Sequence, residues 1–109
     1  MPMAAKGLAK LIEECGELQQ VAGKKLAYYT TDTHPDGALP LSTRLSMEIA
    51  DVMAAAEFVA KHHGLDSEMI KERKAYKLAL FEEWHANPDN NADGIDAGPV
   101  EDRHTDDVR

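Results

Sequence analysis

The sequence predicts an all-α fold built from three antiparallel helices. Three stretches place apolar residues at helical spacing, no stretch alternates polar and apolar residues as a strand would, and loops with glycine or proline separate the stretches. The chain has 109 residues, 43% hydrophobic and 29% charged, which fits one globular domain. We divide it into a helical domain of residues 1–86 and an acidic, disordered tail of residues 87–109.

The first predicted helix spans residues 3–29, which are rich in alanine, leucine, lysine, glutamate and glutamine. Because each helical residue advances roughly 100° around the axis, the apolar residues gather on one side: Leu8, Leu11, Cys15, Leu18, Ala22, Leu26 and Tyr29. Glu14 and Glu17 fall on the border of this side, and Glu13 points further away. A loop with two prolines and a glycine follows over residues 30–40.

The second predicted helix is capped by Ser42, runs to about His63 and stops at Gly64. One stripe on its surface is formed by Leu41, Leu45, Glu48, Val52, Ala55, Val59 and His62. Glu48 thus interrupts an apolar stripe, with Asp51 beside it. An unpaired ionised carboxylate in a core is strongly disfavoured, so Glu48 must be protonated, paired with a cation or bound to a metal.

The third predicted helix is capped by Asp66 or Ser67 and runs to about His85. A short loop separates it from the second helix, so we expect the two to be antiparallel neighbours. Three helices make a thin core, which favours a homo-oligomer in which helices of two or more chains complete a four-helix-type core. The tail is acidic and lacks aromatic residues, which is typical of disorder.

Charge and composition exclude several classes of function. The formal net charge is −8, which argues against non-specific binding to nucleic acid. No apolar run approaches the ~18 residues of a membrane span, and the N-terminus lacks the apolar segment of a secretory signal. A single cysteine fits a reducing compartment. We therefore expect a cytoplasmic protein without nucleic-acid or membrane partners.

Two carboxylate pairs have the same spacing on two different helices. Glu14 and Glu17 are three residues apart, as are Glu48 and Asp51, and residues at that spacing are neighbours on a helix surface. On facing helices the pairs would form a four-carboxylate site, which repels itself unless a cation neutralises it. Oxygen ligands without histidine or thiolate select hard cations, so we expect Mg²⁺, with Mn²⁺ as a substitute, and phosphate groups at its open positions.

The same residues resemble a known family. "EECGE" (residues 13–17) followed by "EIAD" (residues 48–51) is similar to the EExxE and ExxD signature of the MazG-like all-α nucleoside triphosphate pyrophosphohydrolases. The flanking "LIEECGEL" and "RLSMEIADVM" fit as well, and the resemblance covers roughly residues 5–85. It implies Mg²⁺-dependent hydrolysis of canonical or modified (deoxy)nucleoside triphosphates to the monophosphate and pyrophosphate, by helical dimers or tetramers.

The resemblance also implies roles for individual residues. The metal ligands would be Glu14, Glu17, Glu48 and Asp51. Glu13 and Glu17 would be the catalytic carboxylates: Glu13 would orient a ligand or polarise water, and either could take the proton of the attacking water. The family tends to place basic groups on the following helix, where Lys77 is the best match and Lys74 the second. Lys24, two turns beyond Glu17 on the same flank, is a third phosphate-binding candidate. Leu80 and Ala75 occupy the positions near the family's later Arg or Asn.

Three alternatives remain open from the sequence. A lysine of the third helix, such as Lys77, can neutralise the acids directly instead of holding a phosphate. The chain can be a non-enzymatic oligomerisation or regulatory module in which Glu48 forms an interchain salt bridge. A ferritin-like di-iron protein is a further option, although that class requires two Glu-x-x-His motifs, and Glu82 with His85 is the one such spacing here.

Overall fold

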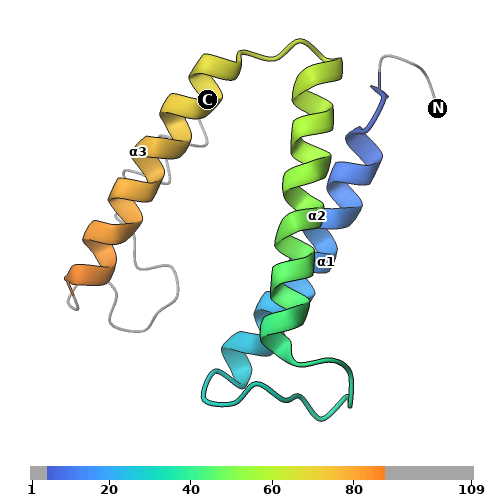
Figure 1. Ribbon diagram of the computed structural model, residues 1–109, viewed down its shortest axis with the longest axis vertical. Coiled ribbons are helices and arrows are strands. Elements are labelled where there is room, and N and C mark those ends of the chain that lie inside the picture. Colours follow the sequence, from blue (N-terminus) through green and yellow to red (C-terminus); the bar gives the residue numbers. More distant parts are fainter. Residues whose placement is uncertain (1–4, 88–109) are drawn as a thin grey trace. The chain divides into compact units, whose positions relative to one another are not determined.

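The computed structural model describes residues 5–87 and contains three α-helices in that range: α1 (Leu8–Ala27), α2 (Leu41–His62) and α3 (Ser67–Ala86) (Figure 1). No strand occurs in this range, so the all-α prediction is confirmed there. The predicted disordered tail lies outside the described residues, apart from Asn87. None of the described helices is both long and apolar enough to cross a membrane.

The chain falls into two compact units, Met1–Asp66 and Ser67–Arg109. The first unit contains α1 and α2, and the second contains α3. Because α2 and α3 belong to different units, their antiparallel arrangement stays a prediction. The carboxylate pairs of the sequence both lie in the first unit, which is therefore the unit that forms the candidate site.

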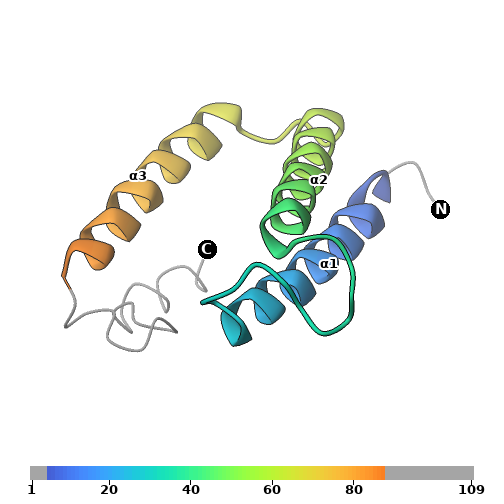
Figure 2. The same cartoon turned by 60° about the horizontal axis from the view of Figure 1, so that its bottom comes forward.

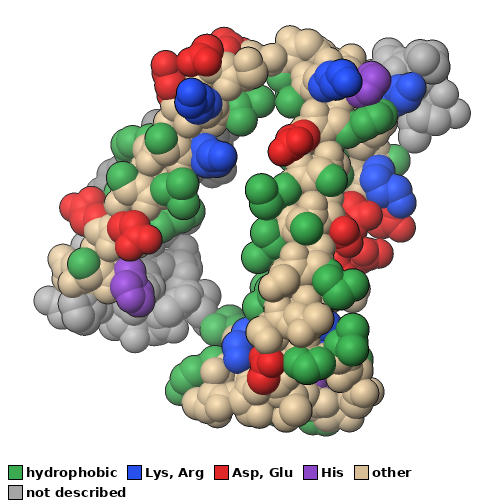
Figure 3. Space-filling model, in the orientation of Figure 1, with side chains coloured by type: hydrophobic (Ala, Val, Ile, Leu, Met, Phe, Trp, Pro, Cys, Tyr) green, Lys and Arg blue, Asp and Glu red, His purple; other side chains and the backbone are tan. Residues whose placement is uncertain are grey.

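In the first unit, α1 and α2 run antiparallel and pack side by side, joined by the loop of residues 28–40 (Figures 1 and 2). The buried hydrophobic side chains of the described range are few: Val21 of α1 and Leu41, Ala55 and Val59 of α2. No residue of α3 is buried. Figure 3 shows hydrophobic side chains on the surface of both units, and acidic side chains gathered where α1 lies beside α2.

The face that α1 turns toward α2 matches the predicted one only in part. The sequence favoured a side that includes Cys15 and Ala22, but both of these residues are exposed. Leu11 and Leu18 of the predicted side are half-buried, as expected, but Glu14 and the buried Val21 share the packed face with them. Apolar residues occur around much of α1, so their spacing does not fix its orientation; the packing against α2 does. As a result Glu14 lies within the packed face rather than on its border.

The start of α2 is stabilised by a loop residue and not by Ser42 alone. The helix begins at Leu41, whose N–H donates to the Asp32 carbonyl at 2.8 Å. The Asp32 carboxylate accepts the Ser42 N–H at 2.8 Å and the Ser42 hydroxyl at 2.7 Å. These bonds, the hydroxyl bond foremost, lower the pKa of Asp32. The prediction that Ser42 supplies the capping oxygen is therefore wrong, because the acceptor comes from Asp32, earlier in the chain.

The end of α2 follows the prediction. The N–H of Leu65 donates to the Ala60 carbonyl, and the N–H of Gly64 donates to the Lys61 carbonyl, which is the hydrogen-bond pattern of a Schellman motif. Gly64 has a φ of +61°, a conformation that glycine adopts without steric cost. The glycine therefore terminates α2, and the chain leaves the helix toward α3.

The start of α1 is held against the end of α2. Gly7 precedes α1 with a φ of +84°, and a Cβ atom there would lie 2.6 Å from Phe58 Cδ2. Gly7→Ala is therefore expected to lower the free energy of unfolding by about 1–3 kcal/mol, from the backbone conformation and the clash. Gly23→Ala, inside α1 with no atom near the added Cβ, is the matched control and is expected to raise it by about 0.5–1 kcal/mol. Urea titration of both variants checks the opposite signs, and a neutral Gly7→Ala would contradict this packing.

Candidate metal centre

Three glutamates from two helices meet between α1 and α2. Glu14 and Glu17 come from α1, and Glu48 comes from α2. One carboxylate oxygen of each lies within 4.8 Å of the others. We call these three residues the glutamate cluster. The antiparallel packing of α1 on α2 brings together residues that are about thirty positions apart in the sequence, so the predicted meeting of acids from both helices is found for these three.

Two oxygens of the glutamate cluster are buried without any hydrogen-bond partner: Oε1 of Glu14 and Oε1 of Glu48. Within residues 5–87, no lysine, arginine or histidine forms an ion pair with a member of the cluster. A buried carboxylate oxygen without a partner is destabilising. The cluster thus lacks the protein partner that would explain its acids as an ordinary salt bridge within the described chain.

The acids of the cluster raise one another's proton affinity. Burial raises the pKa of Glu14, and the charges of Glu17 and Asp51 raise it further. Burial likewise raises the pKa of Glu48, with the same two charges adding to it and the Arg44 charge opposing them. Since the negative charges are close and two of the carboxylates are half-buried, a proton or a cation would relieve the repulsion between them.

A hard divalent cation fits this group of residues. The donors are all carboxylate oxygens, which suit Mg²⁺ or Mn²⁺, and two of them are buried and unpaired. A cation would satisfy both orphaned oxygens and cancel the repulsion that raises the two pKa values. A shared proton can bridge two carboxylates but neutralises one negative charge, whereas a divalent cation neutralises two, so a cation would compensate the cluster more fully near neutral pH.

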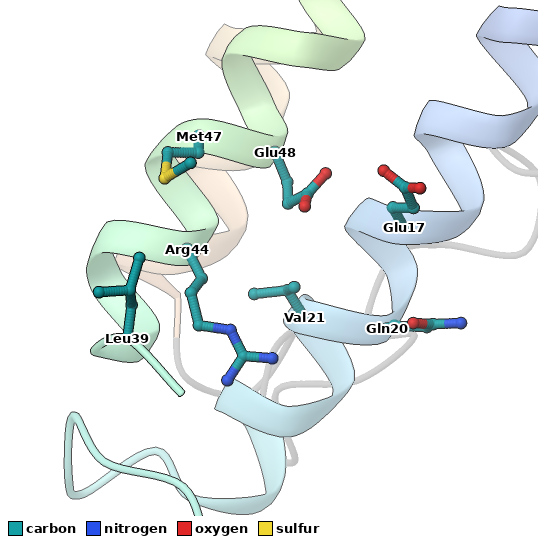
Figure 4. A pocket seen from close by; sticks show the side chains of 7 residues that line it. All are labelled: Glu17, Gln20, Val21, Leu39, Arg44, Met47 and Glu48. Atoms are coloured by element: carbon teal, nitrogen blue, oxygen red, sulfur yellow. The ribbon is translucent and has the colours of Figure 1, made fainter. Parts of the chain in front are cut away.

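A pocket of about 380 Å³ opens next to the cluster. It is lined by Glu17, Gln20, Val21, Leu39, Arg44, Met47 and Glu48. Figure 4 shows the carboxylates of Glu17 and Glu48 pointing toward one another across the pocket, with the Arg44 side chain reaching from α2 toward α1. The volume lies within the range of small-molecule sites. The pocket therefore combines acidic and basic side chains with apolar walls.

The other predicted acids lie at the edge of the cluster or outside it. Asp51 is exposed and is not among the three glutamates, although its charge affects Glu14 and Glu48. Its role as a fourth ligand stays a prediction. Glu13 is exposed and accepts a hydrogen bond from Lys10 at 2.6 Å. The structure thus pairs Glu13 away from the cluster, and its catalytic role also stays a prediction.

The predicted phosphate-binding lysines occupy different units. Lys24 is in the first unit, where its Nζ donates to Asp36 Oδ2 at 3.0 Å. Lys74 and Lys77 are on α3 in the second unit, and the Lys77 Nζ lies 5.3 Å from the centre of the Phe81 ring. The structure therefore brings none of the three into the lining of the pocket within the first unit, and their phosphate-binding role stays a prediction.

Sequence reasoning missed the cation that does line the pocket, Arg44. A signal was present, because Arg44 precedes Glu48 by four residues and so lies one helical turn away on the same face. It also missed Asp36, whose carboxylate accepts a hydrogen bond from Arg44 Nη1. Asp36 is in the loop of residues 28–40, where no periodicity indicates which side chain faces the helices.

Comparisons of the chain with family models, curated proteins and solved structures add no evidence about the site. The chain matches no family model, no curated protein and no solved structure.

Proposed function

We propose that the chain is a Mg²⁺-dependent hydrolase that converts nucleoside triphosphates, including deoxy forms, to the monophosphate and pyrophosphate. The observation that supports this most is the pair of buried, unpartnered oxygens of Glu14 and Glu48, next to Glu17 and an open pocket. The cleavage between the α- and β-phosphorus atoms is inferred from the resemblance to the MazG-like family and not from the geometry.

The metal would be held by Glu14, Glu17 and Glu48, with Asp51 as the fourth ligand. Bound there, Mg²⁺ would supply positive charge to the carboxylates and phosphates and acidify the water that it contacts. Glu17 is the only exposed member of the glutamate cluster and lines the pocket. We assign to it, with Glu13 as the second candidate, the removal of a proton from the water that attacks the substrate.

We further propose a homodimer or homotetramer. The support is the small core of the described chain, four buried hydrophobic side chains, together with large apolar side chains left exposed on all three helices, for example Ile12, Met53 and Ile70. A second copy can cover these side chains. The same feature favours the rival function, a non-enzymatic oligomerisation or regulatory module, which predicts no effect of divalent cations on stability or ligand binding.

Pyrophosphate release tests the proposed function. Purified protein is incubated with Mg²⁺ and a panel of canonical and modified ribo- and deoxyribonucleoside triphosphates, and monophosphate and pyrophosphate are quantified by chromatography. We expect both products in equal amounts from at least one substrate, and none when EDTA is present. Release of inorganic phosphate with the diphosphate would contradict the proposed bond cleavage. No turnover across the panel, with stability indifferent to Mg²⁺, would favour the oligomerisation module.

A further inference from the structure

Arg44 is the one basic residue that lines the pocket within the described chain. Its side chain is 16% exposed and starts on α2, one turn before Glu48. Figure 4 shows it, like Val21 of α1, below the facing carboxylates of Glu17 and Glu48. The pocket therefore has two chemically different ends, one formed by carboxylates and one by a guanidinium group.

The guanidinium group is held by Asp36 of the preceding loop. Nη1 of Arg44 donates to Asp36 Oδ1 at 3.3 Å and to Oδ2 at 3.2 Å. Asp36 is itself fixed, since Oδ1 accepts the Ala38 N–H at 3.1 Å and Oδ2 accepts the Lys24 ammonium at 3.0 Å. These contacts hold the pKa of Asp36 far below its ordinary range; the hydrogen bond from the Ala38 N–H lowers it most, and those from Lys24 and Arg44 lower it further. Asp36 therefore stays ionised and keeps Arg44 in one place.

Much of the hydrogen-bonding capacity of Arg44 is unused. An arginine has five N–H donors in a planar fork, and within residues 5–87 only Nη1 has a protein acceptor. The side chain that carries Nε and Nη2 is partly exposed and lines the pocket. Arg44 also forms no ion pair with Glu48, although its charge lowers the proton affinity of that residue. Neutralising Glu48 by direct contact is therefore not its role.

We propose that Arg44 binds the phosphate oxygens of a metal-complexed polyphosphate chain, and that Asp36 is a positioning residue that holds Arg44 for this contact. This inference rests on the proposed function and adds to it a phosphate-binding residue that lies within the first unit. A cation held by the glutamate cluster and an anion held by Arg44 would occupy the two ends of one pocket. The planar guanidinium fork suits two oxygens of one phosphate group.

Equilibrium binding of inorganic tripolyphosphate tests the inference without requiring turnover. Calorimetry in excess Mg²⁺ compares the wild type with Arg44→Gln, Asp36→Asn, the double variant and Lys61→Gln. Lys61→Gln is the matched control, because it removes one positive charge from the exposed end of α2. We expect Arg44→Gln to weaken binding about tenfold or more, Asp36→Asn to weaken it less, and Lys61→Gln to leave it unchanged.

Two further readouts separate positioning from a structural effect. If Asp36 acts through Arg44, Asp36→Asn has no added effect in the Arg44→Gln background, and in turnover it raises KM more than it lowers kcat. Mn²⁺ binding, measured by electron paramagnetic resonance, stays intact in both single variants. If Arg44→Gln does not fold, Arg44→Lys replaces it; this variant keeps the charge but lacks the fork, and is expected to bind tripolyphosphate several-fold more weakly.

Each outcome decides a different claim. Wild-type affinity for tripolyphosphate in folded Arg44→Gln, with hydrolysis of triphosphates present, would overturn the inference and leave the proposed function standing. Binding that depends on Arg44, without hydrolysis of any nucleotide, would support the inference and overturn the proposed hydrolysis. A wild-type protein that binds neither Mn²⁺ nor Mg²⁺-tripolyphosphate would overturn both.

Discussion

Glu48→Gln is expected to lower kcat/KM for pyrophosphate release by about 100-fold or more. Replacing a residue that only hydrogen-bonds to a metal ligand already lowers metal affinity or activity by about 10–100-fold. Glutamine keeps the shape of the side chain but removes the charge that a divalent cation requires. Glu48 lies inside the packed face of α2 with one oxygen buried and unpartnered, so its replacement removes a charge from the interior of the glutamate cluster. The measurement is steady-state kinetics on the best substrate of the panel.

Glu57→Gln is the matched control for this variant. Glu57 is on the same helix, exposed, and lines no part of the pocket. We expect its kcat/KM to equal that of the wild type within about twofold, in line with surface substitutions. Equal, small losses in both variants would show that helix α2 tolerates the loss of either charge and that Glu48 holds no catalytic cation.

The stability of the metal-free protein is expected to peak near pH 4. Asp32 and Asp36 have pKa values lowered from 3.8, so their stabilisation is present above that pH and is lost as the pH falls toward their folded-state values. Glu14 and Glu48 have pKa values raised from 4.5, so the folded state binds their protons more tightly than the unfolded state. Stability therefore declines as the pH rises above 4.5 through the folded-state values.

Mg²⁺ is expected to reverse the decline on the alkaline side. A ligand that binds only the folded state stabilises it by about 2.7 kcal/mol at a hundred times its Kd. Thermal unfolding from pH 3 to 8, in EDTA and in saturating Mg²⁺, measures both effects. In Glu48→Gln we expect a smaller decline above pH 4.5 and no response to Mg²⁺. A wild-type melting temperature that rises steadily from pH 4 to 7 in EDTA would contradict the arrangement of the glutamate cluster.

Local signals in the sequence predicted the helices well. The end of α2 at Gly64 followed from the glycine and the end of the apolar stripe, and the Schellman hydrogen bonds confirm it. The half-buried position of Glu48 followed from a stripe in which the neighbouring positions are apolar. Both features depend only on residues within a few turns of one helix, which periodicity describes.

Features that depend on contacts between distant residues were not predictable in the same way. The orientation of α1 is set by its packing on α2, and so Glu14 was placed on a border although it lies within the packed face. The cap of α2 comes from Asp32, and Asp36 reaches Arg44 from the loop. Loop residues have no period that indicates their direction, and so the residues that hold Arg44 emerge only from the three-dimensional structure.

Direct measurement of cation binding tests the central claim, that Glu14, Glu17 and Glu48 form a divalent-cation site. Mn²⁺ is titrated into metal-free wild type, Glu48→Gln and Glu57→Gln at pH 7.5, and the unbound ion is followed by electron paramagnetic resonance, with Mg²⁺ added as competitor. We predict at least one Mn²⁺ bound per chain and displaced by Mg²⁺ in the wild type and in Glu57→Gln, and lost in Glu48→Gln. Equal Mn²⁺ binding by all three proteins, or by none, would contradict it.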